Sequence, residues 1–160
     1  MQEHEEKFMK KAAQAGIAEV ELGKLAPERA REDEVRQFGE RMVRDHTHSS
    51  EELKRLAADK HVDLPREPDQ KHRDEKKELS RMSGPTFDTQ FMKGMLHDHR
   101  HVVEEFRDEL DKAEDADLKK FIANTLPILE DHLRSARRIA QELGIAAEER
   151  TAARDREQRP

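Results

Sequence analysis

The chain has 160 residues, of which 33% are hydrophobic and 42% charged, and its 37 acidic and 31 basic side chains are interspersed. It contains no cysteine, which excludes a disulfide framework, a thiolate metal site and a cysteine nucleophile. It has no run of 18 apolar residues, so we expect no membrane-spanning helix. Without Trp, Tyr or a basic stripe, we expect no nucleic-acid binding.

The first half of the chain predicts two long helices joined by a short link. In residues 4–31, apolar and small side chains recur at spacings of three and four, which indicates an amphipathic helix. Pro27 should kink or end this helix near Ala26. The same spacing predicts a second helix over residues 33–60.

The second half predicts two more long helices after a long connection. Pro and Gly residues break regular structure in residues 61–85, although residues 71–82 are predicted to form a short amphipathic turn. Helical spacing returns over residues 86–113 and 116–143. The charged tail, residues 146–160, is predicted to be disordered.

The lengths of the three connections predict the topology. Short first and third links favour antiparallel hairpins, and the long second connection permits a crossover along the bundle. We therefore expect residues 1–145 to form one all-α domain, a ferritin-like four-helix bundle with two hairpins joined by a crossover.

Each predicted helix carries an apolar stripe along its length, which we call its seam. Within each seam lies one side chain of a kind that binds metal ions: Glu19, His46, His99 and His132. In each hairpin the two polar residues are equally far from the turn, so they should lie at the same height. Three imidazoles and one carboxylate would complete a tetrahedral shell. The donors suit a divalent Zn, Fe, Mn or Cu ion without distinguishing among them.

Other side chains flank these candidate ligands. Asp45, Asp98 and Asp131 each precede a seam histidine, and could accept the second ring N–H of a ligand on a neighbouring helix. Met42 and Met95 lie one helical turn before a seam histidine. They are interpreted as core filler, and the alternative is a pair of thioether ligands that would favour Cu(I).

A metal-free interpretation stays open, in which Glu19 and the histidines hydrogen-bond one another around a buried water. No Glu-x-x-His motif occurs in the seams, so a ferritin-type di-iron site is not predicted. His4, His61 and His72 show no spacing that indicates a site.

Several short motifs occur together along the chain. They include Ala18-Glu19 in the first predicted helix, Asp45-His46 in the second, and Leu64-Pro65, Phe87-Asp88, Asp98-His99 and Leu126-Pro127 with His132-Leu133 further on. Over about residues 5–143 this combination resembles an uncharacterised bacterial family, a domain of unknown function. The resemblance implies a ferritin-like fold and no established activity. Members are often labelled as exported (periplasmic) or outer-membrane proteins and many carry signal peptides, whereas the polar residues 1–10 indicate none here.

Three functions follow as hypotheses. The first is a metal-binding bundle for metal handling or stress protection. The second is a mononuclear metal oxidoreductase, which is less favoured because no substrate pocket or general base is recognisable. The third is a metal-free structural or interaction protein with a polar core layer. The high charge favours a monomer or a homodimer.

Overall fold

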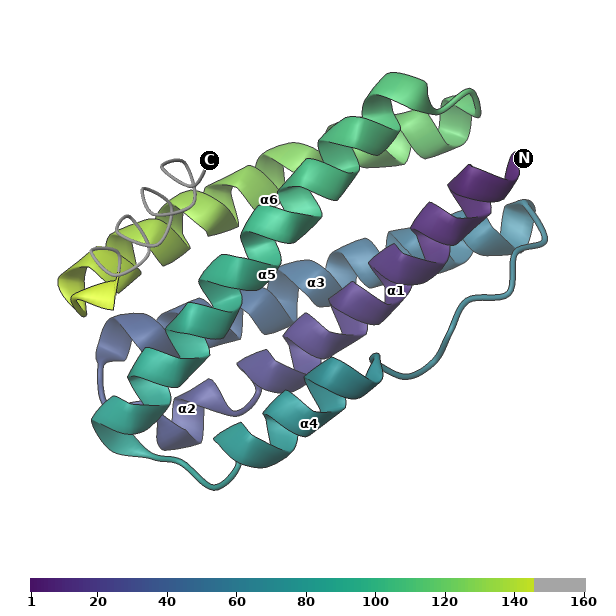
Figure 1. The fold of residues 1–160 in the computed structure, drawn as a ribbon. Helices are drawn as coiled ribbons and strands as arrows, with labels where there is room; N and C mark the ends of the chain where they lie inside the picture. The colour runs from purple at the N-terminus through teal and green to yellow at the C-terminus, as the bar shows by residue number, and fades with distance from the viewer. Residues whose placement is uncertain (146–160) are drawn as a thin grey trace, which may run out of the picture.

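The computed structural model describes residues 1–145, and all regular structure in this part of the chain is helical (Figure 1). The all-α prediction is therefore confirmed, while the tail predicted to be disordered, residues 146–160, lies outside the described residues. Four helices are long and two are short. They are α1 (Glu3–Gly23), α2 (Ala26–Arg29), α3 (Asp33–Asp59), α4 (Gln70–Leu79), α5 (Gly84–Lys112) and α6 (Ala116–Glu142).

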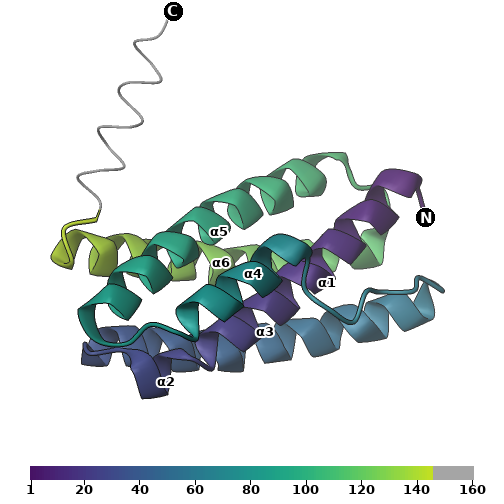
Figure 2. The same cartoon turned by 60° about the horizontal axis from the view of Figure 1, so that its bottom comes forward.

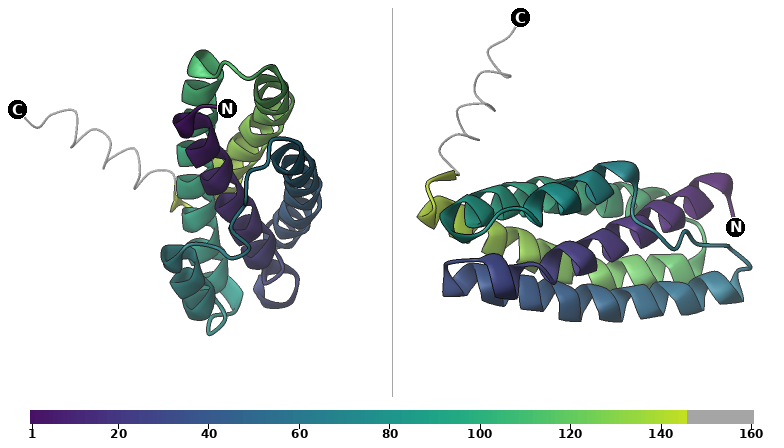
Figure 3. Two further views of the ribbon diagram at one scale, coloured as in Figure 1. Left: turned by 90° about the vertical axis from the view of Figure 1, so that its right-hand side faces the viewer. Right: turned by 90° about the horizontal axis from the view of Figure 1, so that it is seen from below.

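The long helices form two antiparallel pairs, α1 with α3 and α5 with α6 (Figure 1). Residues 60–69 leave the end of α3 and run back beside α1 to reach α4 (Figure 2). The short helix α4 packs on α1 and α5, outside the four long helices (Figure 3). The chain therefore crosses the length of the bundle between its second and third long helices.

The interior is built mainly from aliphatic, Met and Phe side chains that face inward from the long helices. Phe8 of α1 contacts Phe106 of α5 with ring centroids 4.9 Å apart, which joins the two helix pairs. A smaller set of buried residues is polar. This set consists of Glu5, Glu19, His46, Asp88, Asp98, His99, Glu109, Thr125 and His132.

Two of the buried carboxylates hold links between helices in place. Asp88 accepts hydrogen bonds from the backbone N–H groups of Arg31 and Glu32, each at 2.9 Å, and fixes the start of α3 against α5. Glu5 accepts one from the backbone N–H of Asp115 at 3.0 Å, which fixes the α5–α6 link against α1. These two carboxylates therefore have structural partners.

The first helix is shorter than the predicted 4–31, because the chain turns before Pro27. Helix α1 ends at Gly23, and α2 begins at Ala26 with Pro27 in its first turn. Proline is tolerated there because a first-turn N–H has no intrahelical acceptor. A methyl group at Gly39 would overlap the Cβ of Ala26, so glycine permits the close approach of α2 and α3.

The remaining helices begin and end close to their predicted bounds, and the predicted amphipathic turn over 71–82 is α4. Among the helices of residues 1–145, none is both long and apolar enough to cross a membrane.

Candidate metal centre

Three buried histidine rings meet in the bundle interior, one each from α3, α5 and α6. His46, His99 and His132 are 7%, 1% and 0% exposed. Their ring centroids are 5.7 Å apart for His46 and His99, 5.2 Å for His46 and His132, and 5.3 Å for His99 and His132. One ring nitrogen of each lies within 4.8 Å of those of the other two. We call these residues the three-histidine cluster.

Hydrogen bonds fix the orientation of two of these rings. Nδ1–H of His99 donates to the backbone carbonyl of Met95 at 2.8 Å. Nε2–H of His132 donates to the carboxylate of Asp45 at 2.7 Å. Both acceptors require a proton on the nitrogen that faces them, so the lone pair is on the other nitrogen of each ring. Nε2 of His46, Nε2 of His99 and Nδ1 of His132 are buried without a hydrogen-bond partner.

Burial keeps the three imidazoles neutral. It lowers the pKa of His46 well below 6.5, and the neighbouring histidines lower it further. It lowers the pKa of His99 to about 4. The pKa of His132 is also lowered by burial, although Asp45 opposes the shift. Near neutral pH all three rings therefore offer lone pairs, which is the form that binds a metal ion.

A cavity of about 30 Å³ adjoins the cluster. His46 and His99 line it together with Glu19, and most of its other walls are aliphatic or aromatic. Since a water molecule needs about 10–15 Å³ on this measure, the cavity has room for one or two waters or a small ligand.

Glu19, which the sequence predicted would join the three histidines, lines the same cavity as His46 and His99 but is not one of the three residues whose ring nitrogens all lie within 4.8 Å of one another. Its side chain is buried, and its Oε2 has no hydrogen-bond partner. A carboxylate oxygen of Glu19 instead lies within 4.8 Å of donor atoms of His72 and Asp98. We call Glu19, His72 and Asp98 the outer cluster.

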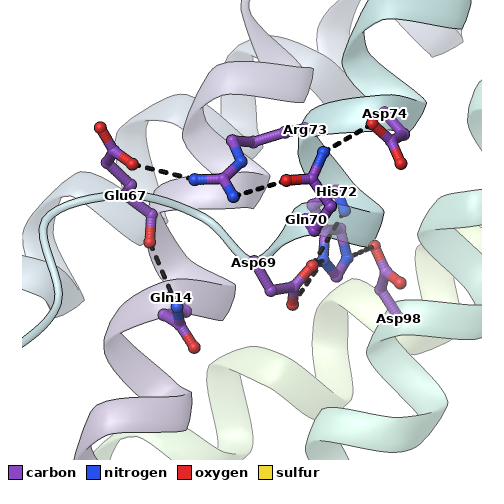
Figure 4. A network of polar contacts seen from close by, with 8 residues as sticks. All are labelled: Gln14, Glu67, Asp69, Gln70, His72, Arg73, Asp74 and Asp98. Carbon is purple, nitrogen blue, oxygen red and sulfur yellow. Dashed lines mark hydrogen bonds and ion pairs between the residues drawn. The ribbon is translucent and has the colours of Figure 1, made fainter.

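In the outer cluster, each ring nitrogen of His72 faces a carboxylate (Figure 4). Its Nε2 lies 3.1 Å from Asp98, and its Nδ1 lies 2.8 Å and 3.0 Å from the two oxygens of Asp69. Asp69 also caps α4 by accepting the backbone N–H of His72 at 2.9 Å. The cap and the ring contact together direct Nε2 of His72 toward Asp98 on α5.

Protonation in the outer cluster is opposite to that in the three-histidine cluster. The hydrogen bond to Asp98 is the largest cause that raises the pKa of His72, to about 9. Burial and then the charge of Asp98 raise the pKa of Glu19 well above its usual value. Burial opposes ionisation of Asp98, but the hydrogen bond from His72 lowers its pKa overall. The outer cluster therefore retains protons near neutral pH.

The remaining predicted residues fall in different places. Asp45 contacts His132 on the neighbouring helix, whereas Asp131 is exposed and pairs with Arg134. Met42 and Met95 are buried in the hydrophobic core, and Met95 contributes its backbone carbonyl to the cluster.

Sequence reasoning missed His72. One local signal was present, because Asp69 lies two residues before the predicted amphipathic segment 71–82 and has His72 three residues later. An aspartate that caps a helix lies close to the residue three positions on. That signal would have placed the His72 ring beside a carboxylate, but not beside α1 or α5.

The fold and this site describe an all-α bundle with a buried cluster of histidines. The chain belongs to the family described as Domain of unknown function (DUF4142), whose model matches residues 1–139. It is similar in structure to a protein from Streptomyces coelicolor, described as a DUF305 protein thought to be secreted, with a TM-score of 0.73. That match covers 86% of this chain and 90% of the other at 14% identity, so it supports the fold alone. No curated protein matches the chain.

Proposed function

We propose that this protein binds one divalent metal ion through His46, His99 and His132, and that its role is metal handling or stress protection. The observation that carries the proposal is the set of three buried ring nitrogens that lack partners in one cluster. A buried polar atom without a hydrogen bond costs about 1–3 kcal/mol. One ion would satisfy all three.

The geometry is compatible with such an ion after a small adjustment. Metal–imidazole bonds of 2.0–2.1 Å in a tetrahedral site place ligand nitrogens about 3.3 Å apart. Nitrogens already within 4.8 Å would reach this separation by small side-chain rotations. Asp45 and the Met95 carbonyl occupy the orienting positions that metal-bound histidines use.

The helix arrangement supports a ferritin-like bundle as the scaffold. Two antiparallel pairs are joined by one long crossover, and the candidate ligands project inward from facing helices. Three neutral imidazoles suit Zn, Fe or Cu, and suit Mn less well. The adjoining cavity leaves room for a fourth ligand, such as a water.

A metal-free polar layer is the second candidate. The hydrogen bonds of His99 to Met95 and of His132 to Asp45 favour it, because they already satisfy one nitrogen in each ring. A water in the cavity would then serve the remaining lone pairs.

Metal content separates the two candidates. Untagged protein would be measured by elemental mass spectrometry as purified and after reconstitution with Zn, Fe, Mn and Cu salts. His46→Ala is compared with His48→Ala, because His48 lies on the same helix with 72% of its side chain exposed. We expect His46→Ala to lose one equivalent of metal and His48→Ala to retain it. Equal metal content in both variants and the wild type would contradict the three-histidine site.

A further inference from the structure

The outer cluster gathers three donors from three helices. Glu19 is on α1, His72 on α4 and Asp98 on α5, and one donor atom of each lies within 4.8 Å of the others. Glu19 is 2% exposed and Asp98 8% exposed, and 13% of the His72 side chain is exposed. Two nearly buried carboxylates with one partly shielded imidazole are a compact donor set, rather than a solvated acidic surface.

One carboxylate oxygen in this set lacks a partner, although the carboxyl group that carries it also interacts with Asp98. Oε2 of Glu19 is buried and makes no hydrogen bond. Burial and the negative charge of Asp98 both act against an ionised carboxylate at this position. A divalent cation would supply a ligand contact for the oxygen and offset the adjacent negative charges.

The His72 ring is already oriented as a ligand would be. Its Nδ1 faces Asp69, which the cap of α4 holds in place, and its Nε2 faces Asp98 (Figure 4). Metal-bound histidines generally donate their second ring N–H to a carboxylate. A cation near Asp98 would therefore replace the proton on Nε2 and leave the contact with Asp69 intact.

The outer cluster lies between the surface and the three-histidine cluster. Glu19 and Asp98 line the small internal cavity beside His46 and His99. The same two residues, with His72, also line a hollow that opens at the surface over α1, α4 and α5. An ion that reaches the buried histidines needs a route from the surface. Glu19 and Asp98 line both the outer hollow and the internal cavity, so the two spaces adjoin at these residues.

From this geometry we infer that Glu19, His72 and Asp98 form a second divalent-cation site, through which ions reach the three-histidine cluster. One nitrogen and two carboxylate oxygens suit Mn²⁺, Fe²⁺ or Zn²⁺. The existence of this site is independent of the proposed function. Its part in loading rests on the proposed function.

Equilibrium dialysis against ZnCl₂ tests the second site in the full chain. Wild type should bind two equivalents, and His72→Gln, Glu19→Gln and His132→Leu should each bind one. His101→Gln is the matched control, since that exposed histidine lines the same hollow and should leave two equivalents. Circular dichroism checks that each variant is folded, and Asp69→Asn should weaken the outer site about tenfold while leaving its ligands in place.

The outcomes separate the two inferences. If the wild type binds one equivalent of zinc, and this is lost in His132→Leu and kept in His72→Gln, the second site is overturned and the proposed function is retained. If the wild type binds one equivalent of zinc, and this is lost in His72→Gln and kept in His132→Leu, the second site is retained and the proposed function is overturned. Zinc binding unchanged in both variants, or absent from the wild type, would overturn both.

A rate measurement tests loading. Co²⁺ entry into the three-histidine cluster is followed by its visible absorption after rapid mixing. His72→Gln should slow loading about tenfold, because the variant lacks the imidazole nitrogen that would hold the ion at the entrance between Glu19 and Asp98. Its final absorption at saturation should match that of the wild type. An unchanged loading rate would overturn the role of the outer cluster as a route.

Discussion

The three-histidine cluster and the outer cluster are both groups of three residues whose donor atoms lie within 4.8 Å of one another. The pKa values of their histidines are nevertheless shifted in opposite directions. The pKa of His99 is lowered to about 4, with burial as the largest cause. The pKa of His72 is raised to about 9, with the hydrogen bond to Asp98 as the largest cause. Burial alone therefore does not decide the charge of an imidazole. The Asp98 carboxylate outweighs burial at His72, whereas Asp45 opposes burial at His132 without reversing its effect.

This difference also separates the chemistry of the clusters. The three-histidine cluster offers neutral nitrogen donors near neutral pH, so a metal ion displaces few protons there. The outer cluster is formed by charged and protonated groups, so a cation must displace protons but gains carboxylate ligands. Changes of pH and single substitutions should therefore affect the two clusters differently.

Acid should destabilise the metal-free protein through the three-histidine cluster. The unfolded chain protonates His99 below about pH 6.5, whereas the folded chain resists protonation down to about pH 4. Stability from this residue is therefore present above pH 6.5 and lost as the pH falls to about 4, on the order of 3 kcal/mol. Urea unfolding with a chelator, at pH 7.5 and 4.5, measures the loss.

His99→Gln should give a shallower dependence of unfolding free energy on pH in this window than the wild type. The exposed His101→Gln, two residues along α5, is the control and should keep the wild-type dependence. Equal slopes for His99→Gln and the wild type would contradict the contrast between the clusters.

Alkali should act on the outer cluster. Since the folded-state pKa of His72 is raised to about 9, its stabilising effect is full below about pH 6.5. The effect is lost as the pH rises toward 9. Allowing for solvent screening, we expect on the order of 2 kcal/mol. Urea unfolding of the metal-free protein between pH 6 and 9.5 should show the decline in wild type and a flatter profile in His72→Gln. A decline of the same size in that variant would place its origin elsewhere.

The orienting carboxylate should affect metal affinity more than the fold. Asp45→Ala removes the acceptor for Nε2–H of His132 and should weaken metal binding about tenfold, or about 1.4 kcal/mol. Asp131→Ala is the matched control, because Asp131 precedes His132 in sequence but is exposed and paired with Arg134. Competition with a coloured chelator measures both affinities. A similar change in both variants would indicate a general effect of charge.

Much of the fold was predictable because local signals coincide with helix ends. The start of α6 is an example: Asp115 accepts the backbone N–H of Leu118 at 2.9 Å, and the helical spacing begins there. The first helix was predicted too long because Pro27 suits both a kinked helix and the first turn of a new one. Local spacing does not distinguish these two cases.

The sequence could predict only those site residues that lie in the apolar seams of the long helices. His46, His99 and His132 lie in three apolar seams, and the structure brings them together. Glu19, which was predicted at the same height, lines the same cavity as His46 and His99 and also lies within 4.8 Å of donor atoms of His72 and Asp98. His72 could not be placed, because it lies on the crossover and no periodicity states which helices that segment covers.

The position of His72 on this crossover segment gives the outer cluster a topological consequence. A cation held by α1, α4 and α5 would stabilise the folded chain by binding to it and not to the unfolded chain, and would cross-link parts of the chain that are far apart in sequence. Disulfide bonds have this effect in many small proteins, but this chain has no cysteine to form one. A bound ion would thus act as a reversible staple, and its removal would free the crossover before it loosened the bundle.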